Sequence, residues 1–264
     1  MTMDLSKLPP PAVLLKSAQA QAQCAKLIKS ESIELNRGLQ SNVPPLGYVN
    51  LLGTDFLRTL MSLDESTWLD GGCGHLRAQV DGVTRYRTWL PRLPSMVAVT
   101  TILDEATISA AAFLGVVYEQ LKSATFSLIR GSVELLDDGK VTDVALISDV
   151  MGDFAYSQHP DQVLARYASM LRRGGQAFLY RPCSCNMHVS DGNDQHWSFE
   201  ELEAWLRSFS GVRTTSTECA FGGRIIHMER LDDPVVVPPL EPLLYIPGNP
   251  PIRIFRPATA TARA

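Results

Sequence analysis

From residue 66 to about residue 230, short apolar runs alternate with longer segments of helical periodicity, and this alternation limits the fold more than any other feature of the chain. Runs rich in β-branched, aromatic and other apolar residues predict five strands, at or ending at residues 68–69, 96–99, 125–129, 144–147 and 176–180. Strands separated by helices are typical of βα units around a mostly parallel sheet. The sequence therefore predicts an α/β fold with helices on both faces of that sheet.

The segments between these strands carry recognisable helix ends. One helix is predicted over 104–121 and another over 160–173, where Pro160 suits the first turn and Gly174 is expected to stop the helix in a left-handed conformation. A third helix is predicted to begin at Ser198, because Ser198 and Glu201 form a capping box, and to run to about residue 208. Two later apolar segments, 212–218 and 224–229, predict an antiparallel pair that closes one edge of the sheet.

The two ends of the chain differ in composition from this central region. Residues 13–29 are rich in Ala, Gln and Lys, with small and apolar residues at helical spacing, which predicts an amphipathic helix. Eight of the 17 prolines lie between Pro234 and Pro257, yet the residues between them are too apolar for a solvated linker. We therefore expect a helical appendage or lid at 1–50, a core at 51–231, and a Pro-rich extended arm at 232–264, docked on the core or on a neighbouring subunit.

Charge and composition exclude several classes of function. The 264-residue chain has a formal net charge of -4, which rules out a general electrostatic grip on nucleic acid or anionic membrane. Its longest mostly apolar stretch, 108–118, is shorter than the ~20 residues that a membrane-spanning helix needs, and the N-terminus lacks an apolar signal block. Five scattered cysteines do not form the pattern of a disulfide framework. We therefore expect a cytoplasmic protein with reduced thiols.

The most informative motif lies at residues 68–75, where a strand ends in Asp70 and a glycine-rich turn opens the next helix. Gly72 and Gly74 allow a ligand to approach the backbone closely, and the free N–H groups of the helix end attract an anionic group. The carboxylate of Asp70 can receive a cationic or hydroxylated group. A dinucleotide fingerprint would have a third glycine at Arg77, and this chain does not.

This segment resembles motif I of the class I S-adenosylmethionine-dependent methyltransferases, a strand ending in Asp followed by x-Gly-x-Gly, with Leu76 where a third glycine often stands. Further landmarks resemble the family in the same order, at residues 97–100, 130–132, 147–149 and 170–175. The resemblance covers roughly residues 60–230. It implies a Rossmann-like, seven-stranded, mostly parallel sheet with S-adenosylmethionine as the cofactor.

The resemblance also implies which residues hold the cofactor. Family members usually carry an acid after the second strand for the ribose hydroxyls and an Asp after the third for the adenine, whereas this chain has Thr100 or Thr101 and then Ser132. Both departures weaken the expected grip on the cofactor. Tyr48 is expected either to close over the cofactor or to serve as a hydrophobic anchor. The full set of expected cofactor-binding residues is Asp70, Gly72, Gly74, Thr100, Thr101, Ser132, Asp149 and Tyr48.

Catalytic residues are expected in the loop after the fourth strand, at 149–159, because ligands of open α/β sheets bind at the carboxyl ends of the strands. His159 is either a base for a protonated acceptor or a helix-entry residue before Pro160. Tyr156 either holds the acceptor, lines the sulfonium or packs in the core, and Asp153 is either an acceptor contact or a turn residue. The Cys and His residues of 183–196 are too poorly spaced for a metal site, so none is expected.

Three functions are compatible with these residues. The first is methyl transfer to a small-molecule acceptor, a metabolite or natural product of a biosynthetic pathway, with neither nucleic acid nor membrane as partner. The second keeps the cofactor but attacks its aminocarboxypropyl chain, by transfer or intramolecular cyclisation, and releases methylthioadenosine. The third is a non-catalytic, methyltransferase-like binding subunit. A homodimer is compatible with all three.

Overall fold

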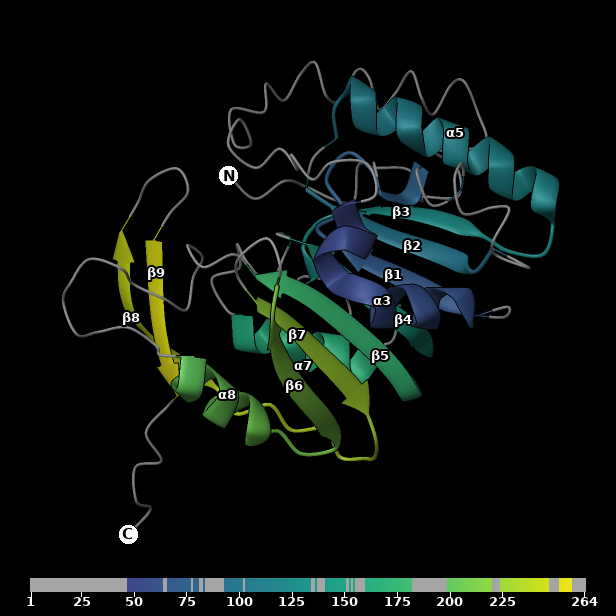
Figure 1. The fold of residues 1–264 in the computed structure, drawn as a ribbon. Helices are drawn as coiled ribbons and strands as arrows, with labels where there is room; N and C mark the ends of the chain where they lie inside the picture. The colour runs from purple at the N-terminus through teal and green to yellow at the C-terminus, as the bar shows by residue number, and fades with distance from the viewer. Residues whose placement is uncertain are drawn as a thin grey trace, which may run out of the picture.

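The central feature of the protein is a seven-stranded sheet with the strand order β3-β2-β1-β4-β5-β7-β6 (Figure 1). The computed structural model describes residues 47–63, 66–76, 78–80, 83, 93–101, 103–133, 136, 141–150, 152, 154, 160–181, 199–219, 224–246 and 252–257. The strands are β1 (Thr67–Gly71), β2 (Ser95–Thr100), β3 (Phe126–Arg130), β4 (Val144–Val150), β5 (Leu171–Arg181), β6 (Val212–Glu218) and β7 (Arg224–Arg230). The first five pair in parallel, and β7 runs antiparallel to both β5 and β6. The predicted α/β fold and its antiparallel edge pair are confirmed.

Helices cover both faces of this sheet, each with its own core. Helices α3 (Gly47–Met61) and α5 (Glu105–Leu121) pack on one face, and α7 (Pro160–Met170) and α8 (Phe199–Arg207) pack on the other. Successive strand residues supply the two cores in turn: Trp68 packs on the α3 side and Leu69 on the α7 side. This alternation explains why the strands are apolar almost throughout, since neither face is exposed to water.

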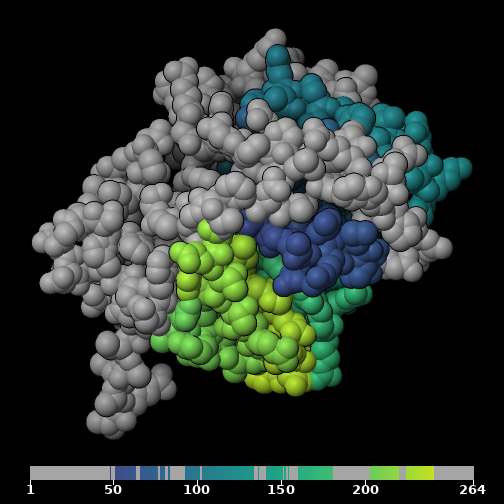
Figure 2. Space-filling model, in the orientation of Figure 1, coloured from purple at the N-terminus to yellow at the C-terminus, as the bar shows by residue number. Residues whose placement is uncertain are grey.

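Helix α3 is held on the sheet by aromatic contacts. Phe56 meets Trp68 of β1 and Phe178 of β5 edge to face, with ring centroids 6.2 and 5.7 Å apart. On the surface, α3 lies beside the end of β6 (Figure 2), where Cys219 Sγ donates to Leu51 O at 3.5 Å. Helix α3 spans residue 50, where the sequence places the boundary between appendage and core, and it is kinked at Gly53, which has φ 84° and ψ -175°.

Helix α7 ends earlier than its sequence predicts. It stops at Met170 rather than at residue 173, and Gly174, with φ 73°, lies inside β5. Leu171 is fully buried and pairs with Val144 of β4, so extending the helix would remove this residue from the sheet. The predicted glycine stop is therefore wrong, and the chain enters the strand directly.

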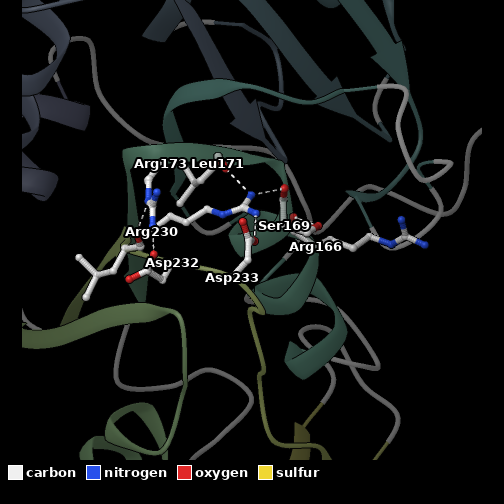
Figure 3. Close-up of polar contacts among 8 residues, drawn as sticks. Arg166, Ser169, Leu171, Arg173, Arg230, Asp232 and Asp233 are labelled. Atoms are coloured by element: carbon white, nitrogen blue, oxygen red, sulfur yellow. Dashed lines mark hydrogen bonds and ion pairs between the residues drawn. The ribbon is translucent and has the colours of Figure 1, made fainter.

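An arginine from β7 caps the end of α7 instead (Figure 3). Arg230 Nη1 donates to Ser169 O at 2.8 Å and to Leu171 O at 2.6 Å, and its Nη2 pairs with Asp233. Carbonyl groups at a helix C-terminus lack hydrogen-bond donors within the helix. A cationic side chain there supplies the donors, and its positive charge interacts favourably with the negative end of the helix dipole. Arg230 thereby ties the end of β7 to the α7–β5 junction.

After β7 the chain first lies along α8 and then forms a hairpin. Ser210 and Val236 exchange two backbone hydrogen bonds of 3.1 and 3.0 Å, and Trp205 Nε1 donates to Pro238 O at 3.1 Å. Strands β8 (Leu240–Ile246) and β9 (Ile252–Pro257) then pair antiparallel in a sheet of their own. Apolar segments of the predicted arm therefore pair with one another. None of the helices in the described part of the chain is long and apolar enough to span a membrane.

Candidate functional site at the carboxyl ends of the parallel strands

Parallel pairing brings polar residues of four strands to one edge of the sheet. Gly71, after Asp70 on β1, is in register with Val99 of β2 on one side and with Asp149 of β4 on the other. Thr100 ends β2, and Arg130 ends β3 beside it. The edge therefore gathers most of the residues that the sequence assigns to cofactor binding.

The turn after β1 has the left-handed backbone that its glycines predict. Gly72 has φ 65° and Gly74 has φ 55°. Cys73 N donates to Val99 O at 2.9 Å, and Thr100 Oγ1 donates to Gly74 O at 3.2 Å, so the turn is fixed to the end of β2. The third position, Leu76, has φ 61° although it is not glycine, and its side chain is fully buried. Leu76 therefore has a backbone conformation that is unfavourable for a residue with a side chain, and burial of that apolar side chain offsets the cost.

Asp70 is fully buried, and both of its oxygens already accept hydrogen bonds. Tyr48 of α3 donates its hydroxyl to Oδ2 at 2.9 Å, Gln79 donates its amide to the same oxygen, and Ser148 of β4 donates to Oδ1. Trp68 Nε1 in turn donates to Ser148 Oγ at 2.8 Å. Burial raises the pKa of Asp70 to about 7, although the three donors act to lower it.

The side-chain amide of Gln79 has one oxygen that accepts no hydrogen bond among the described residues. This oxygen, Oε1, is buried. A buried, unsatisfied acceptor is costly unless something else supplies a donor. The pair formed by this oxygen and the Asp70 carboxylate suits a cationic donor group.

Asp149 organises the backbone after β4. Its Oδ1 accepts from Gly152 N, and its Oδ2 from Phe154 N, both at 2.8 Å, while Tyr167 of α7 donates its hydroxyl to Oδ2 at 2.7 Å. Burial raises the pKa of Asp149 to about 6, against the lowering effect of these donors. Asp149 thus holds the start of the loop in which the sequence predicts catalysis.

The loops after β1 and β4 touch through glycines. A Cβ atom placed on Gly152 would collide with Gly71 O and would lie 2.8 Å from Gly72 Cα. Likewise, a Cβ on Gly71 would overlap the hydroxyl of Tyr167. The missing side chain of Gly152 permits this close approach of the two backbones, and the missing side chain of Gly71 leaves room for the Tyr167 hydroxyl.

The structure also shows an acidic group that the sequence analysis missed. Asp104 caps α5 by accepting from Thr107 N at 2.9 Å, and its Oδ2 lies 2.8 Å from Nε2 of His75 in the glycine-rich turn. Burial raises the pKa of this carboxyl, but the hydrogen bonds from Thr107 and His75 outweigh it and the pKa is lowered. The Asp104 side chain is 40% exposed, so part of it remains accessible. Its N-cap position before a helical run was the available signal.

The predicted cofactor residues fall into different environments. Thr100 is buried with its hydroxyl turned to Gly74, whereas Thr101 is exposed and Ser132 is half-buried after β3. Tyr48 lies inside the core, with its hydroxyl on Asp70. Their roles toward a cofactor stay predictions.

The predicted catalytic residues Asp153, Tyr156 and His159 lie outside the described residues, as do the amphipathic segment 13–29, the Cys- and His-bearing loop at 182–198 and the capping residue Ser198. Within the part of the chain that the structure describes, no three His, Cys, Asp or Glu side chains gather as metal ligands.

Comparisons with known proteins give matches in structure alone. No family model and no curated protein matches the sequence. A methyltransferase of Aquifex aeolicus, described as dependent on S-adenosylmethionine, is 15% identical with a TM-score of 0.45, covering 72% of this chain and 95% of its own. Another of Clostridium acetobutylicum ATCC 824 is 13% identical with a TM-score of 0.48, covering 79% and 99%.

A geranyl diphosphate methyltransferase in complex with that substrate and sinefungin is 14% identical with a TM-score of 0.46, covering 67% of this chain and 77% of its own. At these identities the likeness concerns the fold and not the chemistry. The first two of these structures are described as S-adenosylmethionine-dependent methyltransferases, the family that the residues after the first strand of this chain resemble.

Proposed function

We propose that this protein is an S-adenosylmethionine-dependent methyltransferase that acts on a small-molecule acceptor. The observation that carries the proposal is the edge of the parallel sheet, where the buried Asp70 carboxylate precedes a left-handed glycine turn. A turn of this kind at the carboxyl ends of parallel strands is where open α/β sheets bind ligands.

The donors and acceptors present fit the cofactor. Its amino-acid end carries an ammonium group, which matches the Asp70 carboxylate and the orphaned Gln79 Oε1. Its ribose offers two hydroxyls, which match the partly exposed carboxylate of Asp104, held in place by His75. Asp104 is thus proposed to bind the ribose hydroxyls, a role for which the sequence had indicated Thr100 or Thr101.

When bound, the cofactor supplies a methyl group activated by a positively charged sulfur. The protein's contribution is then to hold the nucleophile in line and to exclude water, which supplies much of the acceleration in such a displacement. Asp149 fixes the first residues of the loop after β4. Asp153, Tyr156 and His159 follow in that loop and are proposed to position the acceptor or remove its proton.

The acceptor is proposed to be small because the chain lacks the basic excess that a nucleic acid needs. Its formal net charge is -4. A protein that binds many phosphates gains most of its affinity from cationic side chains. We also propose that the protein works in the cytoplasm, in a biosynthetic reaction.

Calorimetry with S-adenosylmethionine tests this function. We expect one binding site, and a loss of affinity of about tenfold in Asp104→Asn, which removes the charge while keeping the shape. Asp55→Asn, at an exposed ion pair with Arg58 on α3, is the matched control and should bind normally. Absence of binding heat and of any shift in melting temperature in the unaltered protein would contradict the proposal.

The adenosyl product identifies the reaction. Incubation with the cofactor and a metabolite extract should give S-adenosylhomocysteine by mass spectrometry. Methylthioadenosine would instead indicate attack on the aminocarboxypropyl chain, and binding without consumption would indicate a non-catalytic subunit.

A further inference from the structure

The hydrogen bond between Tyr48 and Asp70 links two parts of the molecule that are 22 residues apart in the sequence. Tyr48 is the second residue of α3, and its side chain is 7% exposed. Its hydroxyl lies 2.9 Å from Oδ2 of Asp70, the residue that precedes the glycine-rich turn. Helix α3 also contacts the sheet through apolar side chains such as Phe56 and through Thr59, whose hydroxyl donates to Gln176 Oε1 of β5 at 3.0 Å. Among the described contacts of α3, the one from Tyr48 reaches the strand end at the proposed cofactor site.

The carboxylate does not depend on Tyr48 for its place in the fold. Ser148 of β4 and Gln79, which follows the turn, also donate to it. Asp70 itself is a residue of β1, which is paired with strands on both sides. Removing one hydroxyl therefore leaves the backbone supported and changes chiefly how well the negative charge is stabilised.

We propose that Tyr48 is a positioning residue for the cofactor, acting through Asp70: its hydroxyl stabilises the charged carboxylate behind the glycine-rich turn and so couples the docking of α3 to ligand binding at that turn. The inference rests on the proposed function for the identity of the ligand. It differs from a lid, because the hydroxyl is turned into the core and toward a carboxylate.

The charge balance around Asp70 makes this coupling sensitive to pH. Asp149 of β4 is the like charge that acts on it, and Tyr48, Ser148 and Gln79 are its neutral donors. Tyr48 itself has a raised pKa, through burial and then through Asp70 and Cys73, so it remains a protonated donor. Because each donor lowers the pKa of Asp70 from the value that burial alone would give, removing one raises it further.

The test is the pH dependence of S-adenosylmethionine binding in Tyr48→Phe, measured by calorimetry from pH 6 to pH 9. A positively charged ligand binds better when Asp70 is ionised. At pH 7 we expect the variant to bind about fivefold more weakly than the unaltered protein, the ratio for an upward pKa shift of about one unit from about 7. At pH 9 the two affinities should converge, since Asp70 is ionised in both.

Tyr118→Phe is the matched control. Tyr118 is also a buried tyrosine, and its hydroxyl donates to a backbone oxygen, Pro94 O, at 2.9 Å on the α5 side. It should lose some stability and keep the affinity and pH profile of the unaltered protein. A role of Tyr48 in packing alone would make its variant behave in the same way, with an unchanged pH profile, and would overturn the inference.

Two ligand-free measurements separate this inference from the proposed function. The fall in unfolding free energy that Asp70 causes with rising pH should extend to higher pH in Tyr48→Phe, and hydrogen exchange in the first turn of α3 should become faster. If the unaltered protein does not bind S-adenosylmethionine but both changes occur, the function is wrong and the Tyr48–Asp70 coupling stands. If neither change occurs, the coupling is wrong whatever the ligand.

Discussion

At the scale of single residues, two carboxyl groups are kept from water at the ends of adjacent parallel strands. Asp70 and Asp149 each accept three hydrogen bonds, yet burial raises their pKa values to about 7 and about 6. Each group therefore holds its proton more tightly in the folded protein than in the unfolded chain. Its stabilising effect is complete below the unfolded pKa of 3.8 and is lost as pH rises through the folded value.

The first prediction concerns this pH dependence. Asp70→Asn keeps the size of the side chain but cannot ionise. The unfolding free energy of the unaltered protein should fall relative to that of the variant between about pH 4 and pH 7, because one pKa unit corresponds to about 1.4 kcal/mol. Urea unfolding at a series of pH values measures the difference. A difference that does not change with pH would contradict a raised pKa for Asp70.

Leu76 supplies the second prediction, because its backbone is left-handed while its side chain is buried. Leu76→Ala and Leu76→Gly both empty the same site, and the alanine variant should lose about 2–5 kcal/mol. The glycine variant should be the more stable of the two by about 1 kcal/mol, because glycine adopts φ 61° without strain. Urea unfolding decides the order. Alanine as the more stable variant would show that this conformation is not strained.

At the scale of elements, the strands could be predicted from the sequence and one helix end could not. Each predicted strand is an apolar run, and burial of both sheet faces makes that signal strong. The end of α7 depends on Arg230, about 60 residues later, and on the pairing of Leu171 with Val144. A local pattern such as Gly174 after a helical stripe contains no information about either contact.

The third prediction tests the cap on α7. Arg230→Met keeps the aliphatic stem but leaves the carbonyls of Ser169 and Leu171 without this donor (Figure 3). We expect a loss of about 1–3 kcal/mol in unfolding free energy, the usual cost when a hydrogen bond from a charged group is removed. Arg58→Met, from an ion pair whose side chains are 80% and 75% exposed, is the control and should change stability by less than about 1 kcal/mol. Equal losses would exclude a capping role.

At the scale of the whole molecule, the candidate site is assembled from α3, the turn after β1, the start of α5 and the loop after β4. The turn could be predicted from the sequence, because its residues are contiguous and its glycines indicate a left-handed backbone. The sequence analysis missed Asp104 as a partner of His75, since that contact joins residues 29 apart. It also could not show that Tyr48 is turned toward Asp70, because only the packing of α3 on the sheet brings them together.

The fourth prediction separates two roles of Asp104. Serine also caps helices, so Asp104→Ser should retain most of the stability while losing the carboxylate. We expect its affinity for S-adenosylmethionine to fall about tenfold, and its unfolding free energy to fall by no more than about 1 kcal/mol. Asp104→Ala should show the same loss of affinity with a larger loss of stability. An unchanged affinity in the serine variant would leave Asp104 as a helix cap alone.

The bare backbones at Gly71, Gly72 and Gly152 make the two loops mechanically dependent on each other. Because no side chain lies between them, we expect a shift of either loop toward the other by a fraction of an ångström to displace the other. A ligand that binds the loop after β1 would therefore change the position of the loop after β4, where the second ligand is expected to bind. In a library randomised at position 152 and selected for folded protein, only glycine should be recovered, since even a methyl group would collide with Gly71 O and separate the two loops.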